Sequence, residues 1–136
     1  PPPPPPPPPP PVLQAEDGIR DRVSCLVGSE MCIRDRVGTV GAITVELGQR
    51  GMAGDADAML GHSWDYLDMF ATLVIGWQWL NMASVATSAP ISEERRQAID
   101  ASTQYWIRTE VPRIALLANL CRANEDSYIR AQPDWF

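Results

Sequence analysis

Few residues of this chain have side chains that could carry out chemistry. His62 is the only histidine, and Asp65 follows it three positions later, so both side chains would share one face of a helix. Such a pair could begin a metal site or orient a general base, but a zinc site needs three or four ligands. The pair therefore predicts an ordinary surface hydrogen bond.

Two further motifs are weaker. Gly61-His62-Ser63 resembles half of a nucleophile elbow, which needs a strand-to-helix turn and a second glycine. Asp65 stands where that glycine would be and the segment lies within a helical pattern, so the elbow is rejected. Cys121 has no histidine near it in sequence and is predicted to be a buried, unreactive thiol. The sequence thus predicts no catalytic, cofactor-binding or metal-ligating residue.

The charge balance narrows the classes of partner. The chain carries a formal net charge of −6 and contains arginine but no lysine. A nucleic-acid partner requires a basic patch that neutralises phosphates, and an anionic membrane surface attracts basic clusters. Neither a nucleic-acid partner nor a membrane partner is expected.

The first 36 residues differ in composition from the rest. Residues 1–11 are all proline, which would ordinarily indicate a polyproline II spacer or recognition tract. However, residues 14–21 and 25–35 back-translate, in order and in one frame, to two elements that resemble short-read library adaptors. We expect residues 1–36 to be a translated adaptor artefact that is disordered, and the protein to be truncated before residue 37. With Cys25 and Cys32 excluded, one cysteine remains, which is typical of the cytoplasmic compartment.

Helical periodicity covers residues 37–123. A short helix is predicted over 37–50, one long helix over 55–87 with Asp55 as N-cap, and a third over 93–123 with Ser92 as N-cap. Pro112 should kink the third helix or end its first half, because it removes one backbone hydrogen bond.

The predicted fold is all-α, an antiparallel bundle of about three helices over residues 37–136. The long helix has one apolar seam at Tyr66, Phe70, Leu73, Trp77 and Leu80 and an adjoining one at Met59, Ser63, Leu67 and Val74. The third helix is expected to bury Ala98, Ser102, Tyr105, Trp106, Thr109, Leu116, Leu117 and Leu120.

The middle helix is unusually apolar. Residues 69–86 could be considered membrane-spanning, but Gln78 and Asn81 interrupt them and no basic residue flanks them closely, so a buried core helix is favoured. Its two wide apolar faces need more cover than two neighbouring helices supply. A missing N-terminal portion or a partner subunit is expected to provide it. The tryptophans Trp64, Trp77, Trp79 and Trp106 are expected in the core rather than as ligand-stacking residues.

Three runs together resemble a known family: residues 63–70 (SWDYLDMF), 76–83 (GWQWLNMA) and 101–112 (ASTQYWIRTEVP). They are similar to the acetyl-CoA dehydrogenase-like C-terminal domain of bacterial acyl-CoA dehydrogenases, including those similar to 3-methylmercaptopropionyl-CoA dehydrogenase. The resemblance covers about residues 40–121.

The resemblance implies a parent flavoenzyme that uses FAD in the α,β-dehydrogenation of an acyl-CoA thioester, with its catalytic glutamate upstream. Glu46 and Glu110 match no motif for that role, and the fragment alone is expected to be inactive. The resemblance implies a structural role for Trp77, Trp79, Tyr105 and Pro112, with the remainder of the dehydrogenase core and possibly a second subunit as partners. A free-standing helical interaction module without catalytic activity is the alternative.

Overall fold

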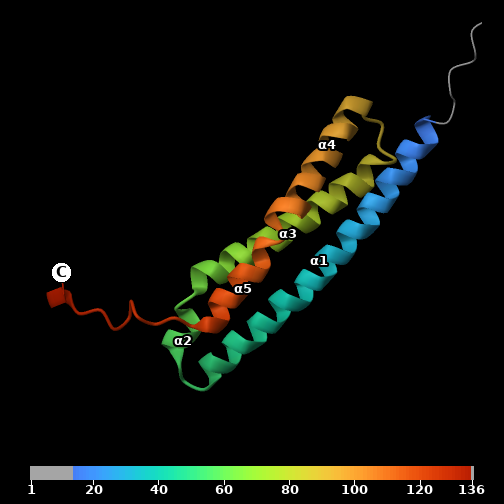
Figure 1. Cartoon of the computed structure of the whole chain (residues 1–136). Helices are drawn as coiled ribbons and strands as arrows, with labels where there is room; N and C mark the ends of the chain where they lie inside the picture. Colours follow the sequence, from blue (N-terminus) through green and yellow to red (C-terminus); the bar gives the residue numbers. More distant parts are fainter. Residues whose placement is uncertain (1–13, 136) are drawn as a thin grey trace, which may run out of the picture.

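The computed structural model describes residues 14–135, with side chains described from residue 28 onward. Every regular element in this part of the chain is a helix. The elements are α1 (Gln14–Met52), α2 (Ala56–Leu60), α3 (Ser63–Ala86), α4 (Glu93–Tyr105), the π-helix η1 (Trp106–Glu110), α5 (Arg113–Ala123) and the 3-10 helix η2 (Pro133–Trp135). Figure 1 shows three long rods, namely α1, α3, and α4 continued by α5, with the C-terminal tail leading away from them. The predicted all-α antiparallel bundle is confirmed.

The first helix is longer than its pattern predicted. It was expected over 37–50, after a disordered segment, but α1 begins at Gln14. The helix α1 thus includes residues 14–36, whereas residues 1–13 lie outside the described part. Residues 14–36 contain no proline that would stop a helix, and the buried side chain of Ile33 belongs to the core.

The second predicted helix is divided in two. Asp55 caps α2 as expected, because its carboxylate accepts a hydrogen bond of 2.9 Å from the backbone N–H of Ala58. The chain then turns at Gly61 and His62 before α3 begins. A Cβ at Gly61 would lie 3.0 Å from the Asp57 carbonyl oxygen and would require the exposed Tyr128 side chain to move, so glycine fits this turn without any adjustment. The single helix expected over 55–87 is thus corrected to α2 and α3.

The third predicted helix is interrupted where Pro112 stands. Ser92 caps α4 as expected, accepting from the backbone N–H of Arg95 at 3.3 Å. Before Pro112 the helix widens into η1, in which the N–H of Val111 donates to the carbonyl of Trp106, five residues back. The helical path resumes at Arg113, so the predicted break is confirmed and takes the form of a π-helical turn.

The core lies where α1, α3 and the α4–α5 rod meet. Its buried members are Ile33, Val40, Ile43, Leu47, Met69, Leu73, Leu80, Ile107, Val111, Ile114, Leu117, Ala118 and Cys121.

Two predicted apolar faces are corrected. In α3, Leu73 and Leu80 are buried, but Phe70 and Trp77 of the same predicted seam are exposed. In the third rod, Leu117 is buried as expected, whereas Tyr105 and Leu116 point to solvent. The buried row lies beside the predicted one on the helix surface and runs through Thr103, Ile107, Val111, Ile114, Ala118 and Cys121.

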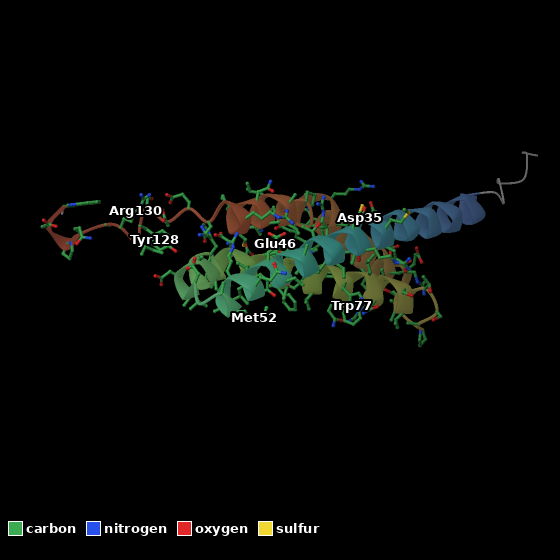
Figure 2. All side chains as sticks on the ribbon, turned by 90° about the horizontal axis from the view of Figure 1, so that it is seen from below. Asp35, Glu46, Met52, Trp77, Tyr128 and Arg130 are labelled. Atoms are coloured by element: carbon green, nitrogen blue, oxygen red, sulfur yellow. The ribbon has the colours of Figure 1, made fainter. Side chains whose placement is uncertain are left out.

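Hydrogen bonds and an ion pair join the C-terminal part of α1 to the C-terminal end of α5. Arg50 of α1 donates to the carbonyls of Cys121 at 2.9 Å and Arg122 at 3.1 Å, which have no partner within α5 because they end it. Glu46, labelled in Figure 2, accepts from the guanidinium of Arg122 at 3.1 Å. Since these partners lie more than seventy residues apart in sequence, they fix the register of α1 against α5.

Candidate functional site

The predicted histidine–aspartate pair forms at the start of α3. His62 precedes the first turn, and its Nδ1 lies 2.9 Å from a carboxylate oxygen of Asp65. The prediction of an ordinary hydrogen bond is confirmed, but the pair is half-buried rather than on the surface. His62 Nε2 is buried without a hydrogen-bond partner among the described residues. No group of three or more histidine, cysteine or acidic side chains that could hold a metal occurs between residues 28 and 135.

Cys121 lies closer to this pair than its sequence position indicated. Its thiol sits 3.9 Å from the carbonyl oxygen of His62 and is buried, as predicted. Burial raises the pKa of the Cys121 thiol, and the negative charge of Asp65 raises it further, whereas Arg50 lowers it. A thiol held protonated in this way is a poor nucleophile, so the proximity of cysteine, histidine and aspartate does not make a catalytic triad. Ser63 begins α3 directly after the turn at Gly61 and His62 that follows α2, so this segment joins two helices and lacks the strand-to-helix turn of a nucleophile elbow.

The two glutamates set aside as catalytic candidates are ion-paired. Glu46 pairs with Arg122, as described above, and Glu110 pairs with Arg113 at 2.7 Å. Arg113 also reaches Asp68 of α3 at 2.9 Å. Each glutamate therefore has a structural partner that explains its position.

The most distinctive surface is the side of α3 that faces away from α1 and α5, which we call the outer face. It exposes eight large hydrophobic side chains: Trp64, Leu67, Phe70, Val74, Ile75, Trp77, Met82 and Val85. Trp64 is 78% exposed and Trp77, labelled in Figure 2, is 51% exposed, so their expected burial in the core is corrected. Trp79 and Trp106 are half-buried. Large exposed apolar side chains gathered on one side of a helix are typical of a surface that contacts another protein segment.

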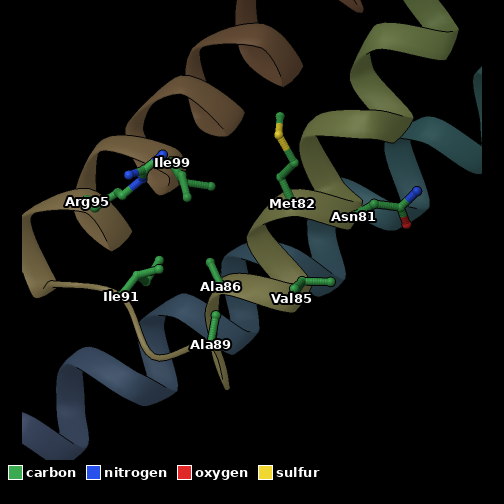
Figure 3. A pocket seen from close by; sticks show the side chains of 8 residues that line it. All are labelled: Asn81, Met82, Val85, Ala86, Ala89, Ile91, Arg95 and Ile99. Carbon is green, nitrogen blue, oxygen red and sulfur yellow. The ribbon is translucent and has the colours of Figure 1, made fainter.

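A groove continues the outer face at the C-terminal end of α3. It has a volume of about 550 Å³ and is lined by Asn81, Met82, Val85, Ala86, Ala89, Ile91, Arg95 and Ile99. Figure 3 shows Ile91, Arg95 and Ile99 facing Met82 and Ala86 across it. The lining is apolar apart from Arg95 and Asn81.

Two adjacent arginines have different roles at this groove. Arg96 donates to the carbonyls of Ala86 at 2.8 Å and Ala89 at 3.2 Å, and pairs with Glu93 at 3.0 Å. It thereby closes the end of α3 and fixes the turn into α4. Arg95 lines the groove, and its guanidinium forms no ion pair with the described residues, so it is available to bind a ligand or partner. Sequence reasoning missed both arginines, and Arg50 as well, because nothing in their spacing distinguishes them from solvent-exposed arginines.

The stretch Ala56–Ala86 is long and apolar enough to cross a membrane by length and composition, and 39% of its most apolar window is buried in the bundle. The favoured assignment as a core helix holds for its inner side, which packs on α1, α4 and α5. Its outer face remains uncovered.

The fold defines a helical domain. Its exposed apolar side chains lie on the outer face of α3, and the groove beside them is lined by apolar residues rather than by reactive groups. The family described as "Acetyl-CoA dehydrogenase C-terminal like" matches residues 32–132, and the chain belongs to this family. This agrees with the resemblance carried by the three sequence runs. No curated protein and no solved structure gave a significant match. The family match begins at Cys32, inside the segment assigned to adaptor sequence, so the boundary after residue 36 stays a prediction.

Proposed function

We propose that this chain is the C-terminal structural domain of a FAD-dependent acyl-CoA dehydrogenase, the parent reaction being α,β-dehydrogenation of an acyl-CoA thioester. The observation that carries the proposal is membership of the family over residues 32–132. The broad apolar outer face of α3 also supports it, since a domain that is part of a larger assembly has a reason to keep such a face. FAD would be bound by upstream domains, and the fragment alone would be inactive.

The remaining parts of the proposal rest on the amino-acid sequence alone. Residues 1–36 derive from library adaptor, the native chain continues upstream of residue 37, and the enzyme is cytoplasmic. The remainder of the dehydrogenase core, and possibly a second subunit, are the proposed partners.

Sequencing the native gene across the codon for Val37 tests the proposal directly. An open reading frame that encodes a flavoprotein core in frame before Val37 is the expected result. A start codon near Val37 without such a core would instead favour the free-standing helical interaction module. Native codons for residues 1–36 would refute the adaptor origin.

A biochemical test separates the domain from its parent. The full-length enzyme should purify with bound flavin and reduce it on addition of an acyl-CoA, whereas residues 37–136 alone should show neither flavin absorbance nor dehydrogenase activity. Flavin bound by the fragment would contradict the assignment of a purely structural role.

A further inference from the structure

The inner side of α3 has a row of buried positions that runs through most of the helix. They alternate spacings of four and three residues and are Met69, Leu73, Gly76, Leu80 and Ala83. A row on α1 has the same alternation and consists of Ser29, Ile33, Arg36, Val40, Ile43 and Leu47. Every member of the α1 row is buried except Arg36, which is half-buried. Two such rows are typical of helices that pack side by side along their length.

Two contacts show which residues of the antiparallel helices α1 and α3 lie opposite each other. The hydroxyl oxygens of Thr44 and Tyr66 are 2.9 Å apart, and a Cβ built at Gly76 would lie 2.9 Å from Cδ1 of Ile33. Counted on from either contact, the last residue of α3 lies opposite position 23 or 24 of α1. Figure 1 shows α1 beside α3 along this length. The second half of α3 therefore faces positions of α1 that precede residue 37.

Gly76 forms a notch in this second half of α3. A Cβ there would lie 2.9 Å from Cδ1 of Ile33, 3.2 Å from Cγ2 of Val111 and 3.3 Å from Cδ1 of Trp106. Because Gly76 has no side chain, a large aliphatic side chain of α1 can enter between α3 and η1, as a knob enters a hole. The walls of the notch belong to the native part of the chain, so the notch requires an aliphatic residue at position 33 of the native protein.

The composition of the α1 row changes where adaptor sequence is predicted to give way to native sequence. After residue 37 the row is aliphatic throughout. Before it, Ser29 and Arg36 are polar and only Ile33 is aliphatic. A row that faces the buried side of another helix is expected to be apolar at every position. The polar residues indicate that a segment not selected for this packing stands in the place of a native helix.

We propose that the native chain continues α1 upstream of Val37 as an unbroken helix over about positions 24–36, with a large aliphatic side chain at position 33 seated in the Gly76 notch. At 1.5 Å per residue this segment adds about 20 Å to the helix. The inference rests on the proposed function, because it takes residues 1–36 to be adaptor-derived. The chain from the flavoprotein core then enters the bundle at the end where α3 turns into α4, opposite the end from which the C-terminal tail leaves (Figure 1).

The native gene upstream of the codon for Val37 tests the proposal directly. The expected result is a stretch of about thirteen codons without proline, with leucine, isoleucine, valine or methionine at position 33. A proline in this stretch, or a polar residue at position 33, would overturn the inference even if a flavoprotein core is encoded further upstream. In that case the proposed function would stand. Native codons for residues 1–36 would refute the adaptor origin and this inference with it.

Substitutions in the whole chain test the notch itself. Ile33→Ala should lower the urea midpoint by on the order of 1 M, because it empties the notch. Met31→Ala is the matched control: Met31 is 66% exposed on α1, whereas Ile33 is 5% exposed, and the control should shift the midpoint by less than about 0.3 M. Equal midpoints of the two variants would overturn the inference.

The half-buried position in the α1 row gives a test in the opposite direction. Arg36→Leu should raise the urea midpoint, because it makes the row apolar, whereas Arg34→Leu, at an exposed position of α1, should not. A chain in which the native codons replace those for residues 24–36 should also have a higher midpoint than the present chain. An unchanged or lower midpoint of that chain would contradict a native helix in this place.

Discussion

The indole nitrogen of Trp106 donates a hydrogen bond of 3.0 Å to the main-chain carbonyl of Thr72, joining the π-helical turn η1 to the middle of α3. Trp106 is also the residue whose carbonyl accepts from Val111 across the widened turn. One side chain therefore anchors the irregular segment that Pro112 imposes. Gly76, one turn after Thr72, leaves room for this approach, since a Cβ there would lie 3.3 Å from the Trp106 ring.

Trp106→Phe should lower the free energy of unfolding by about 1–2 kcal/mol, because it removes a part-buried hydrogen bond and some packed volume. Trp135→Phe, which changes an exposed tryptophan in the tail, should shift stability by less than about 0.5 kcal/mol. Urea unfolding followed by circular dichroism would measure both. Equal effects of the two substitutions would show that the hydrogen bond to Thr72 contributes nothing.

Neighbouring residues of α5 test the position of the buried row. Ile114 is 0% exposed and Leu116, two residues later, is 63% exposed. Ile114→Ala should cost about 2–5 kcal/mol through lost burial and the resulting cavity, whereas Leu116→Ala should cost less than about 0.5 kcal/mol. Chemical denaturation distinguishes them, and a larger cost at Leu116 would place the core on the face that sequence periodicity predicted.

Arg50 is expected to stabilise the C-terminal end of α5. Arg50→Ala should cost about 1–3 kcal/mol, since it leaves the terminal carbonyls of Cys121 and Arg122 without their charged donor. Arg50→Lys should recover only part of this, because an ammonium group cannot reproduce the planar fork that reaches both carbonyls.

Hydrogen exchange of the last turn of α5 gives a local readout for Arg50. Faster exchange there is expected in Arg50→Ala. The matched control is Arg130→Ala, which removes an exposed pair with Asp126 in the tail and should change stability by less than about 0.5 kcal/mol. Unaltered exchange in Arg50→Ala would contradict the capping role.

The buried thiol of Cys121 predicts a dependence of stability on pH. Since burial raises its pKa in the folded state, the unfolded chain releases the thiol proton at a lower pH than the folded chain does. The folded state then binds more protons, so the free energy of unfolding should fall as pH rises above the ordinary thiol pKa of about 8.5. Cys121→Ala should remove this component of the alkaline decline.

Thiol labelling provides an independent check on Cys121. In a Cys25→Ser background, the exposed Cys32 should react rapidly with a disulfide reagent, whereas Cys121 should react only on unfolding. Rapid native-state labelling of Cys121 would contradict both its burial and its assignment as an unreactive thiol.

The sequence by itself determined the local features of this fold. The N-caps at Asp55 and Ser92 and the break at Pro112 were predictable because each depends on backbone groups within a few residues. The all-α class and the apolar excess of the middle helix were also predictable from the sequence, since helical periodicity and composition are local properties. The three runs of the family pattern lie on α3 and on the α4–η1 part of the third rod, and their residue types indicated the family that the match over residues 32–132 confirms.

Only the tertiary structure decided which apolar face is buried. Phe70 and Leu73 are both strongly apolar, yet Leu73 belongs to the buried core and Phe70 is exposed. The position of Arg50 at the end of α5, and of Arg95 at the groove, likewise depends on segments far apart in the chain. Helical periodicity identifies apolar faces but not their neighbours, because burial is set by contacts between helices that sequence spacing does not encode.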